Sequence, residues 1–266
     1  MEEFILEKIY WGSYTTYELE ELIKKDPVVL VPVGAYEQHG PHLALNTDKV
    51  ISEKICEELV RRADIPCASL PGIWCGISEH HMKFSGSLTL KHETMSALLF
   101  DILDSLARSG IRKVLAVNSH GGNMVAVNEA LTKASCKYGG TFALLTYWNL
   151  IREEIKENRK SEFGGISHAC EMETALQMYL EPDNVRMDRL PPANNVKGGS
   201  FWSPAMFASN KISMYVPYDQ LSGLGHIGDP QKATPEFGEA VFEAVINKTL
   251  KLVEVIQKGE LLNENH

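Results

Sequence analysis

The segment Pro27-Val-Val-Leu-Val-Pro-Val-Gly34 decides the fold, because it has the composition of a strand that is buried on both faces. Its apolar run is short, rich in Val and free of alternation with polar residues, as is typical of strands in parallel sheets. The chain then continues Glu37-Gln-His-Gly-Pro-His-Leu-Ala-Leu-Asn-Thr-Asp48. Carboxylates and imidazoles therefore follow the strand, and Zn²⁺ or Mn²⁺ binds such donors. A polar loop whose His and Glu side chains face water is the alternative interpretation.

Strand-like and helix-like segments alternate along the rest of the chain. Short apolar runs predict strands at residues 28–33, 66–70, 113–118 and 141–147. Apolar residues at helical spacing predict helices at residues 47–62, 92–109, 124–138, 171–180 and 235–258. We therefore expect a three-layer α/β/α fold, in which a mostly parallel sheet lies between helices.

Length, charge and cysteine spacing exclude several classes of protein. The 266 residues are enough for one large domain, residues 1–266. The formal net charge is −9 and no basic cluster is present, so we expect no nucleic-acid partner. No apolar run reaches the roughly 20 residues of a membrane span and no signal peptide begins the chain, so we expect no membrane partner and a cytoplasmic location. The five cysteines include no Cys-x-x-Cys pair, which argues against a thiolate zinc site.

A histidine also follows the third predicted strand, in the segment Asn118-Ser-His-Gly-Gly-Asn123. Ligands of open α/β sheets bind beyond the carboxyl ends of the strands, so we expect His120 at the same edge as the first segment. Gly121 and Gly122 would let the backbone approach a ligand closely. A structural histidine is the alternative for an isolated His, but the neighbouring glycines and asparagines favour a binding site.

The helix predicted at residues 171–180 is preceded by another histidine, in Ser167-His-Ala-Cys-Glu-Met-Glu-Thr174. If His168 opens this helix, Glu171 is its i+3 neighbour on the same face. Glu173 is then turned about 200° away from Glu171. We therefore assign Glu171 to the metal and Glu173 to a supporting or helix-anchoring position. A solvated acidic first turn is the alternative for Glu173.

Two regions without regular periodicity complete the expected site. His80 and His81 lie in a loop at residues 76–89, where we expect substrate contact or a subunit interface rather than metal binding. A solvated loop histidine is the alternative for at least one of them. Residues 191–226 are irregular and rich in aromatic side chains, so we interpret them as a substrate lid or a subunit contact. A solvent-exposed excursion is the alternative.

Taken together, these motifs resemble the creatininase family of metal-dependent amidohydrolases. The resemblance is carried by Glu37-Gln-His-Gly-Pro-His42 with Asp48 beyond it, by Asn118-Ser-His-Gly-Gly-Asn123 and by His168-Ala-Cys-Glu-Met-Glu-Thr174. It spans about residues 5–245, and several motifs in the same order are more specific than any one of them.

The family implies a creatininase-like α/β domain, a centre of two divalent metal ions and a homohexamer. We expect Zn²⁺ first, with Mn²⁺ or Fe²⁺ as alternatives. Carried over by motif, Glu37 and His120 would bind one ion and His39 the other. Asp48 would bridge both ions.

One expected metal ligand of the family is replaced in this chain. In creatinine-hydrolysing members a Glu two residues after the strand-end His binds the second ion, and this chain has Gly122 there. Other members carry an acidic residue in the helix motif, where Glu171 stands, so we expect Glu171 to supply the missing ligand.

The resemblance leaves the substrate open. Creatinine-hydrolysing members carry a Trp four residues before the helix-motif His and a Glu just before it, and this chain has Gly164 and Ser167 there. Relatives without these features include deformylases of formylaminopyrimidine nucleotides, a peptidase of redox-cofactor maturation and a hydrolase of 3-dehydro-scyllo-inosose. To substrate contact we assign His80, Trp148, Gly121 and Gly122.

From the resemblance we expect a metal-dependent hydrolase that acts on a small molecule and cleaves the C–N bond of a cyclic amide or a formamide. A bridging hydroxide between two ions roughly 3.5 Å apart would attack the carbonyl carbon. His168 would carry the proton to the leaving nitrogen. We also assign a catalytic role to Glu173. A nucleotide deformylase and a hydrolase that opens a cyclic diketone are alternatives. The non-enzymatic alternative is a metal-stabilised ligand-binding protein.

Overall fold

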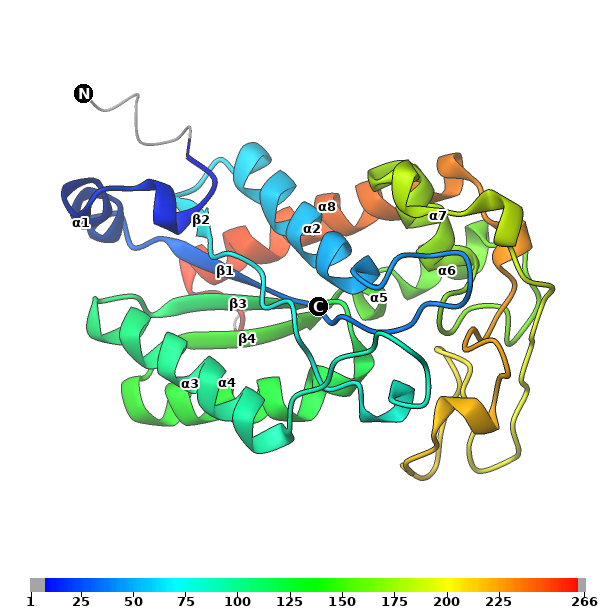
Figure 1. The fold of residues 1–266 in the computed structure, drawn as a ribbon. Coiled ribbons are helices and arrows are strands. Elements are labelled where there is room, and N and C mark those ends of the chain that lie inside the picture. The colour runs from blue at the N-terminus through cyan, green and yellow to red at the C-terminus, as the bar shows by residue number, and fades with distance from the viewer. Residues whose placement is uncertain (1–7, 263–266) are drawn as a thin grey trace.

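Four parallel strands form the centre of the molecule in the computed structural model, which describes residues 8–262 (Figure 1). They are β1 (Val28–Val33), β2 (Cys67–Ser69), β3 (Lys113–Asn118) and β4 (Thr141–Thr146), in the sheet order β2-β1-β3-β4. Each neighbouring pair is parallel. The predicted α/β fold is confirmed, although β2 is shorter than predicted and Tyr147 belongs to the helix after β4.

Helices cover both faces of the sheet (Figure 1). On one face lie α2 (Thr47–Arg62), α7 (Glu171–Leu180) and α8 (Pro235–Lys258). On the other face lie α3 (His92–Arg108) and α4 (Met124–Tyr138), which pack against each other. Across residues 8–262, no helix combines the length and the apolar composition of a membrane span.

Three described helices are not predicted by the apolar periodicity. They are α1 (Thr16–Lys24), α5 (Tyr147–Leu150) and α6 (Arg152–Asn158). α1 begins with a capping box, in which Thr15 and Glu18 each bond the backbone N–H of the other. A capping box can be recognised from the sequence alone. The start of α1 could therefore be predicted from Thr15 and Glu18, although its apolar spacing does not reveal it.

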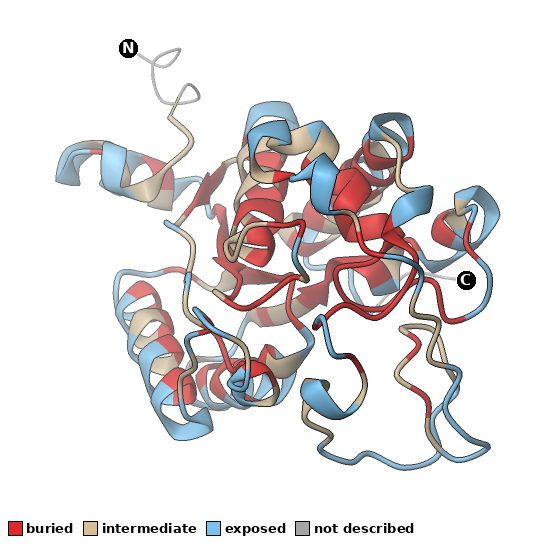
Figure 2. Ribbon diagram, turned by 45° about the vertical axis from the view of Figure 1, so that its right-hand side comes forward, coloured by how far each residue is buried: buried red, intermediate tan, exposed pale blue. Residues whose placement is uncertain are grey.

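The unbroken apolar composition of β1 is explained by burial on both sides. Val28 and Leu30 pack in the core beneath α2, α7 and α8. Val29, Val31 and Val33 pack on the opposite face, beneath α3 and α4. Successive side chains of a strand point to opposite faces, so both sets must be apolar. Figure 2 shows the strands buried, whereas the α3 and α4 layer is exposed on its outer side.

The order in which strands are added to the sheet reverses between β1 and β3. The chain runs from β1 outward to β2 and then crosses to the other side of β1 to form β3. Val33 and Asn118, the last residues of these two strands, are partners in the ladder. Ligands of open α/β sheets bind in the crevice at such a point, and the segments after both strands therefore meet there.

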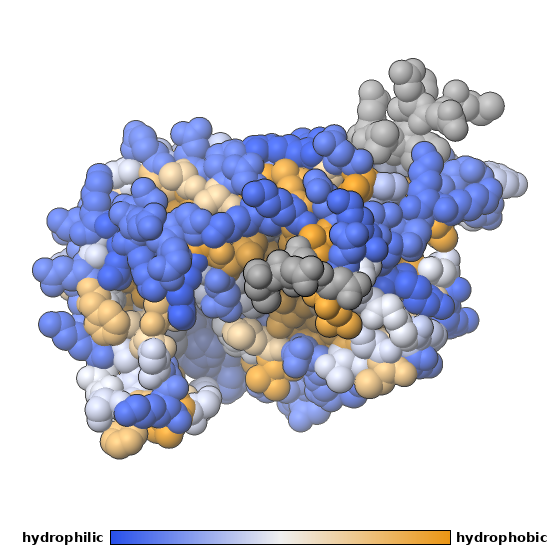
Figure 3. Space-filling view, turned by 180° about the vertical axis from the view of Figure 1, so that it is seen from behind, coloured by the Kyte–Doolittle hydropathy of each residue, from blue (hydrophilic) through white to orange (hydrophobic). Residues whose placement is uncertain are grey.

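Residues 191–226 form an irregular segment with one described 3₁₀ turn, Tyr218–Gln220. It is drawn in yellow to orange in Figure 1 and extends away from the end of the molecule that carries α6 and α7. Figure 3, seen from behind, shows a hollow in the surface between this segment and the helical layers. The segment therefore stands beside the edge of the sheet where the predicted site residues meet.

Candidate metal centre

A cavity of about 620 Å³ opens at the carboxyl ends of β1 and β3. Its volume lies within the range of about 300–1,000 Å³ that is typical of small-molecule sites. Much of its outer wall comes from the irregular segment, between residues 202 and 221. Its inner part is lined by Glu37, Asp48, His120, His168 and Glu173. Segments that are far apart in the sequence therefore converge on one site.

Glu37 and His120 face each other from the loops that follow β1 and β3. The His120 Nδ1 lies 3.1 Å from the Glu37 Oε1. On the other side of the ring, the His120 Nε2 lies 2.9 Å from the carbonyl oxygen of Ile77 and donates to it. This bond fixes the tautomer whose Nδ1 lone pair faces Glu37, which is the arrangement of a metal-binding histidine.

His39 is oriented by a similar bond, and Asp48 lies between the two histidines. The His39 Nδ1 donates to the Glu37 carbonyl oxygen at 3.1 Å, which leaves Nε2 facing the Asp48 Oδ1 at 3.5 Å. The Asp48 Oδ2 lies 3.6 Å from the His120 Nδ1. Asp48 stands in the first turn of α2 and presents one oxygen to each histidine, as a carboxylate shared by two cations does.

Several of these atoms are buried without a hydrogen-bond partner among the described residues. They are Glu37 Oε1, Glu37 Oε2, His39 Nε2 and Asp48 Oδ2. Ligand atoms of Glu37, His39 and Asp48 lie within 4.8 Å of one another. Buried polar atoms without partners are costly, and divalent cations would satisfy them. A donor set of carboxylate oxygens and imidazole nitrogens fits Zn²⁺ or Mn²⁺.

The ionisation of these groups is mutually dependent. Burial lowers the pKa of His39, but the carboxylate of Asp48 outweighs it and the pKa rises to about 10. Burial also lowers the pKa of His120, but Glu37 raises it to about 9. Burial raises the pKa of Glu37, but His120 and His81 hold that pKa well below its ordinary value. The carboxylates therefore hold protons on the imidazoles when no cation is bound.

The remaining ionisable groups of the floor are shifted mainly by burial. Burial raises the pKa of Asp48, and His39 opposes this only in part. Burial raises the pKa of Glu173 to about 7, opposed by His39 and reinforced by Asp48. Burial, with the charges of His39 and His81, holds the pKa of His168 well below its ordinary value. His168 is therefore a neutral imidazole at pH 7.

The structure reverses the positions predicted for the two glutamates of α7. The two oxygens of Glu171 accept the backbone N–H groups of Lys160 at 2.8 Å and Ser161 at 2.9 Å. Glu173 instead lines the cavity and lies within metal-binding distance of His168. The assignment of Glu171 to the metal is therefore wrong, and Glu173 is the carboxylate of this helix that faces the cluster.

The error arises from where the helix begins. α7 starts at Glu171, whereas the prediction assumes that His168 opens it. His168 lies before the helix, in an isolated antiparallel bridge with Ile227. Ala169 has a left-handed φ of 47°, which is uncommon for a residue other than Gly. The chain therefore turns between His168 and Glu171, and the i+3 relation of a helix does not hold. The Ala169 N–H donates to Glu173.

The residues predicted to contact substrate all line the cavity. They are His80, Trp148, Gly121 and Gly122. His80 also lies within metal-binding distance of Glu37 and His120, and burial lowers its pKa to about 3. The second imidazole of the first motif does not join them, because the His42 Nε2 lies 2.9 Å from the Thr174 hydroxyl.

Two further side chains belong to the site but have no predicted role. The amide of Gln38 lies 2.7 Å from the His81 Nδ1. The ring of Tyr218 packs against His81 and His168, with centroid separations of 4.2 Å and 5.1 Å. Tyr218 comes from the irregular segment, where aromatic content is a signal of function but no periodicity indicates which ring turns inward.

The chain is similar to known proteins over nearly its whole length. The family model for creatininase, described as creatinine amidohydrolase, matches residues 12–253. A mycofactocin precursor peptide peptidase of Mycobacterium tuberculosis (strain CDC 1551 / Oshkosh) is 28% identical over 253 residues, covering 91% of this chain and 89% of that protein. The creatinine amidohydrolase of Pseudomonas putida is 30% identical over 204 residues, covering 70% and 78%. A solved structure described as "Creatininase Mn" has a TM-score of 0.78 and 25% identity, covering 93% of this chain and 98% of that chain.

The contrast between the two glutamates of α7 predicts opposite effects of matched substitutions. Glu173→Gln removes a charged oxygen from the cluster, so the affinity of one bound ion should fall by more than the roughly 10–100-fold typical of supporting groups. Glu171→Gln weakens a charge-assisted bond to backbone and should lower the free energy of unfolding by about 1.5–3 kcal/mol while metal content is kept. Metal analysis and urea unfolding of both variants test this, and loss of metal from Glu171→Gln alone would contradict it.

Adjacent glycines provide a second matched pair. A Cβ at Gly122 would lie 2.5 Å from the His120 Nε2 and closer still to the Ile77 carbonyl oxygen, whereas a Cβ at Gly121 meets nothing within 4 Å. Gly122→Ala should therefore displace His120 and weaken Zn²⁺ binding by at least about tenfold, as loss of a supporting contact does. Gly121→Ala should bind Zn²⁺ as the unmodified protein does. Equal Zn²⁺ affinities of the two variants in chelator competition would contradict the assignment of His120 as a ligand.

Metal binding should release protons, because cations require neutral imidazoles. In the metal-free protein the pKa of His39 is raised to about 10 and that of His120 to about 9. Both groups are protonated below these values, so metal affinity should rise with pH until about pH 9–10 is passed. Between pH 6 and pH 8 the affinity should rise by roughly tenfold per pH unit for each proton released. Calorimetric titration in buffers of different ionisation enthalpy measures the number of protons, and a value of zero contradicts the assignment.

Proposed function

Because this chain belongs to the creatininase family, whose members include metal-dependent hydrolases, we propose that it cleaves the C–N bond of a small cyclic amide or formamide at a two-metal centre. Glu37 and His120 would hold one ion, and His39 and Glu173 the other. Asp48 would be shared between them. Zn²⁺ is the ion we propose first, with Mn²⁺ or Fe²⁺ as alternatives, because all accept oxygen and imidazole-nitrogen ligands.

The position of Asp48 is the observation that carries this proposal. Its Oδ1 lies 3.5 Å from the His39 Nε2 and its Oδ2 lies 3.6 Å from the His120 Nδ1. A carboxylate that served only as a partner for one imidazole would need only one of these contacts. Its location at the first turn of α2, which packs on β1, fixes it between the two sheet-edge loops.

Bound ions would supply an activated water and polarise the carbonyl group of the substrate. His168 is placed to handle the proton. Its Nε2 donates to the Gln38 carbonyl oxygen at 2.8 Å, so its Nδ1 lone pair faces the cavity floor. Burial keeps the pKa of His168 low, so this nitrogen is free at pH 7 to accept the proton of the attacking water and deliver it to the leaving nitrogen. The Tyr218 ring meets His168 edge-on and shields it from solvent.

The charge of the cavity supports an uncharged substrate. Among the described residues that line it, the ionisable side chains are carboxylates, imidazoles and phenols. Away from the proposed ions, a phosphate group would meet Glu79 and no Lys or Arg side chain, which is unfavourable in a partly dehydrated pocket. The outer wall offers apolar contacts from Trp202, Met206, Met214 and Val216. We therefore favour an amide with an apolar substituent over a formylaminopyrimidine nucleotide.

Substitution of the shared carboxylate tests the proposed reaction. Asp48→Asn should abolish bound metal and turnover together, because both ions lose a charged oxygen. Asp64→Asn is the matched control, since Asp64 is exposed beyond the far end of α2. Metal content by mass spectrometry and hydrolysis rate are measured for both. Full metal content in Asp48→Asn would contradict the two-metal centre.

A panel of substrates with the metal restored identifies the bond that is cleaved. It contains cyclic amides, formamides, peptide amides and cyclic diketones, each with an apolar substituent and, in a matched version, with a phosphate group. Peptide amides are included because one relative is named a peptidase. We expect cleavage of uncharged amides or formamides, with kcat/KM at least about tenfold lower for versions whose phosphate lies away from the proposed ions, because no Lys or Arg side chain would pair with it there. Cleavage of diketones alone would favour carbon–carbon hydrolysis.

A further inference from the structure

The amide of Gln38 is held in one orientation by backbone groups on both sides. Its Oε1 accepts the Gly40 N–H at 2.9 Å, and its Nε2 donates to the Gly225 carbonyl oxygen at 2.9 Å. The first of these backbone groups only donates and the second only accepts, so a flipped amide would lose both bonds. The Gln38 Nε2 also lies 3.1 Å from the His168 Nε2, but that nitrogen donates to the Gln38 carbonyl oxygen and cannot accept. The remaining hydrogen of the Gln38 Nε2 is therefore left for His81.

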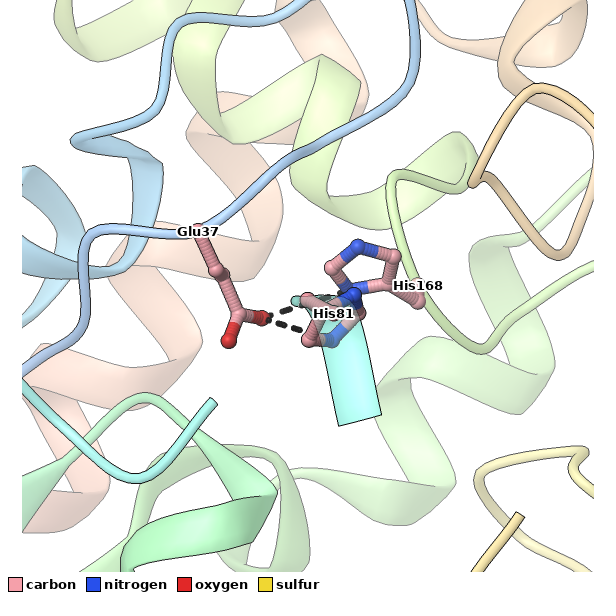
Figure 4. A group of neighbouring side chains, drawn as sticks. All are labelled: Glu37, His81 and His168. Carbon is pink, nitrogen blue, oxygen red and sulfur yellow. Dashed lines mark ion pairs between the residues drawn. The ribbon is translucent and has the colours of Figure 1, made fainter. Parts of the chain in front are cut away.

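This orientation determines the tautomer of His81. The Gln38 Nε2 lies 2.7 Å from the His81 Nδ1, so the amide donates and the imidazole accepts. A neutral imidazole that accepts at Nδ1 carries its hydrogen on Nε2. That Nε2 lies 3.3 Å from the Glu37 Oε1, and its hydrogen has no other acceptor among the described residues. Figure 4 shows Glu37 with its carboxylate turned toward His81 and His168.

The histidines placed at the metal centre or in proton transfer have the opposite arrangement. The outward nitrogens of His39, His120 and His168 lie 2.8–3.1 Å from backbone carbonyl oxygens. Each of these rings therefore keeps a hydrogen on the outward nitrogen, and its neutral form turns a lone pair toward the cluster. His81 turns an N–H toward Glu37 instead. A protonated ring nitrogen does not bind a cation, although His81 lies as close to the cluster as the others.

We propose that His81 is the hydrogen-bond donor that orients Glu37 for its cation, and that Gln38 is the positioning residue that holds His81 in the required tautomer. This rests on the metal centre proposed above. Carboxylates that bind metals are themselves held by hydrogen bonds, and loss of such a partner lowers metal affinity by about 10–100-fold.

The segment that covers the cavity takes part in the same arrangement. Gly225 has a φ of 86°, and a Cβ there would overlap the Gln38 side chain. The ring of Tyr218, from the same segment, lies 4.2 Å from His81 between centroids. Gln38 and His81 are therefore fixed from the β1 loop on one side and from the covering segment on the other, which keeps the donor aimed at Glu37.

Zn²⁺ binding by variants of the full chain separates a donor from a ligand. His81→Gln keeps an N–H donor near the position of Nε2, so it should bind two ions with affinity within about threefold of the unmodified protein. His81→Leu has no donor and should bind the ion held by Glu37 about 10–100-fold more weakly. His120→Gln, the matched loss of a ligand, should fail to hold that ion in competition with a chelator.

Each result has a distinct meaning. If His81→Gln loses an ion as His120→Gln does, His81 is a ligand and the inference is overturned. If His81→Leu binds both ions normally, His81 does not orient Glu37 and the inference is also overturned. If His120→Gln retains both ions at full affinity, the metal centre of the proposed function fails first.

A spectroscopic measurement on the unmodified Zn²⁺-loaded protein does not depend on the folding of variants. With ¹⁵N-labelled histidine, His81 should show a hydrogen on Nε2 and a bare Nδ1 that is not shifted by the metal. A zinc-shifted Nε2, or a hydrogen on Nδ1, would overturn the inference.

The role of Gln38 is tested by combining substitutions. Gln38→Met removes both donors and keeps the volume, so the tautomer of His81 should become mixed and Zn²⁺ affinity should fall by up to about the 10–100-fold of His81→Leu. If Gln38 acts through His81, the double variant should bind no more weakly than His81→Leu alone. Multiplying losses in the double variant would show that Gln38 does not act through His81.

Discussion

Repulsion among buried carboxylates is the constraint on which the site depends. Glu37, Asp48 and Glu173 lie together where little water reaches, and the charge of Glu37 adds to the raised pKa of the other two. Positive charge must accompany them, either as protons on His39 and His120 or as cations that displace those protons. The two states exclude each other, because an imidazole that carries a proton on its inward nitrogen has no lone pair to offer. The metal-free protein therefore holds the protons that bound cations would release.

The fold brings the carboxylates and imidazoles of the site together from the loops after two neighbouring strands and from the first turn of one helix. The two sheet-edge loops supply Glu37, His39 and His120, and the first turn of α2 supplies Asp48. Backbone carbonyls then decide which nitrogen of each ring carries hydrogen. The chemistry of the site thus depends as much on main-chain acceptors as on the side chains that a motif search would recognise. His81 shows the same principle with the opposite result, because a side-chain donor has taken the place of the carbonyl.

Features that depend on neighbouring residues in the sequence could be predicted, and features that depend on a single turn could not. β1 and β3 have the bounds predicted from their apolar runs, since burial on both faces leaves no polar residue inside either strand. Glu37, His39, Asp48 and His120 meet because each follows the end of a strand or opens a helix at the same edge. The choice between Glu171 and Glu173 depended on one backbone angle at Ala169, which no propensity indicates. The inward position of Tyr218 depended on contacts between distant segments, such as the Tyr215 hydroxyl on the Glu79 carbonyl oxygen.

The pairing of Val33 with Asn118 has a consequence for the spacing of the two proposed metal positions. Glu37 and His120 are attached a few residues beyond these partners, so the ladder between β1 and β3 sets how far apart their loops stand. A slip of one residue would shift one loop by about 3.3 Å along the strand axis and turn its side chains to the opposite face. Metal ligands tolerate errors of only about 0.2 Å. The stiffness of two adjacent backbones would therefore keep the proposed pair of cations at a constant separation.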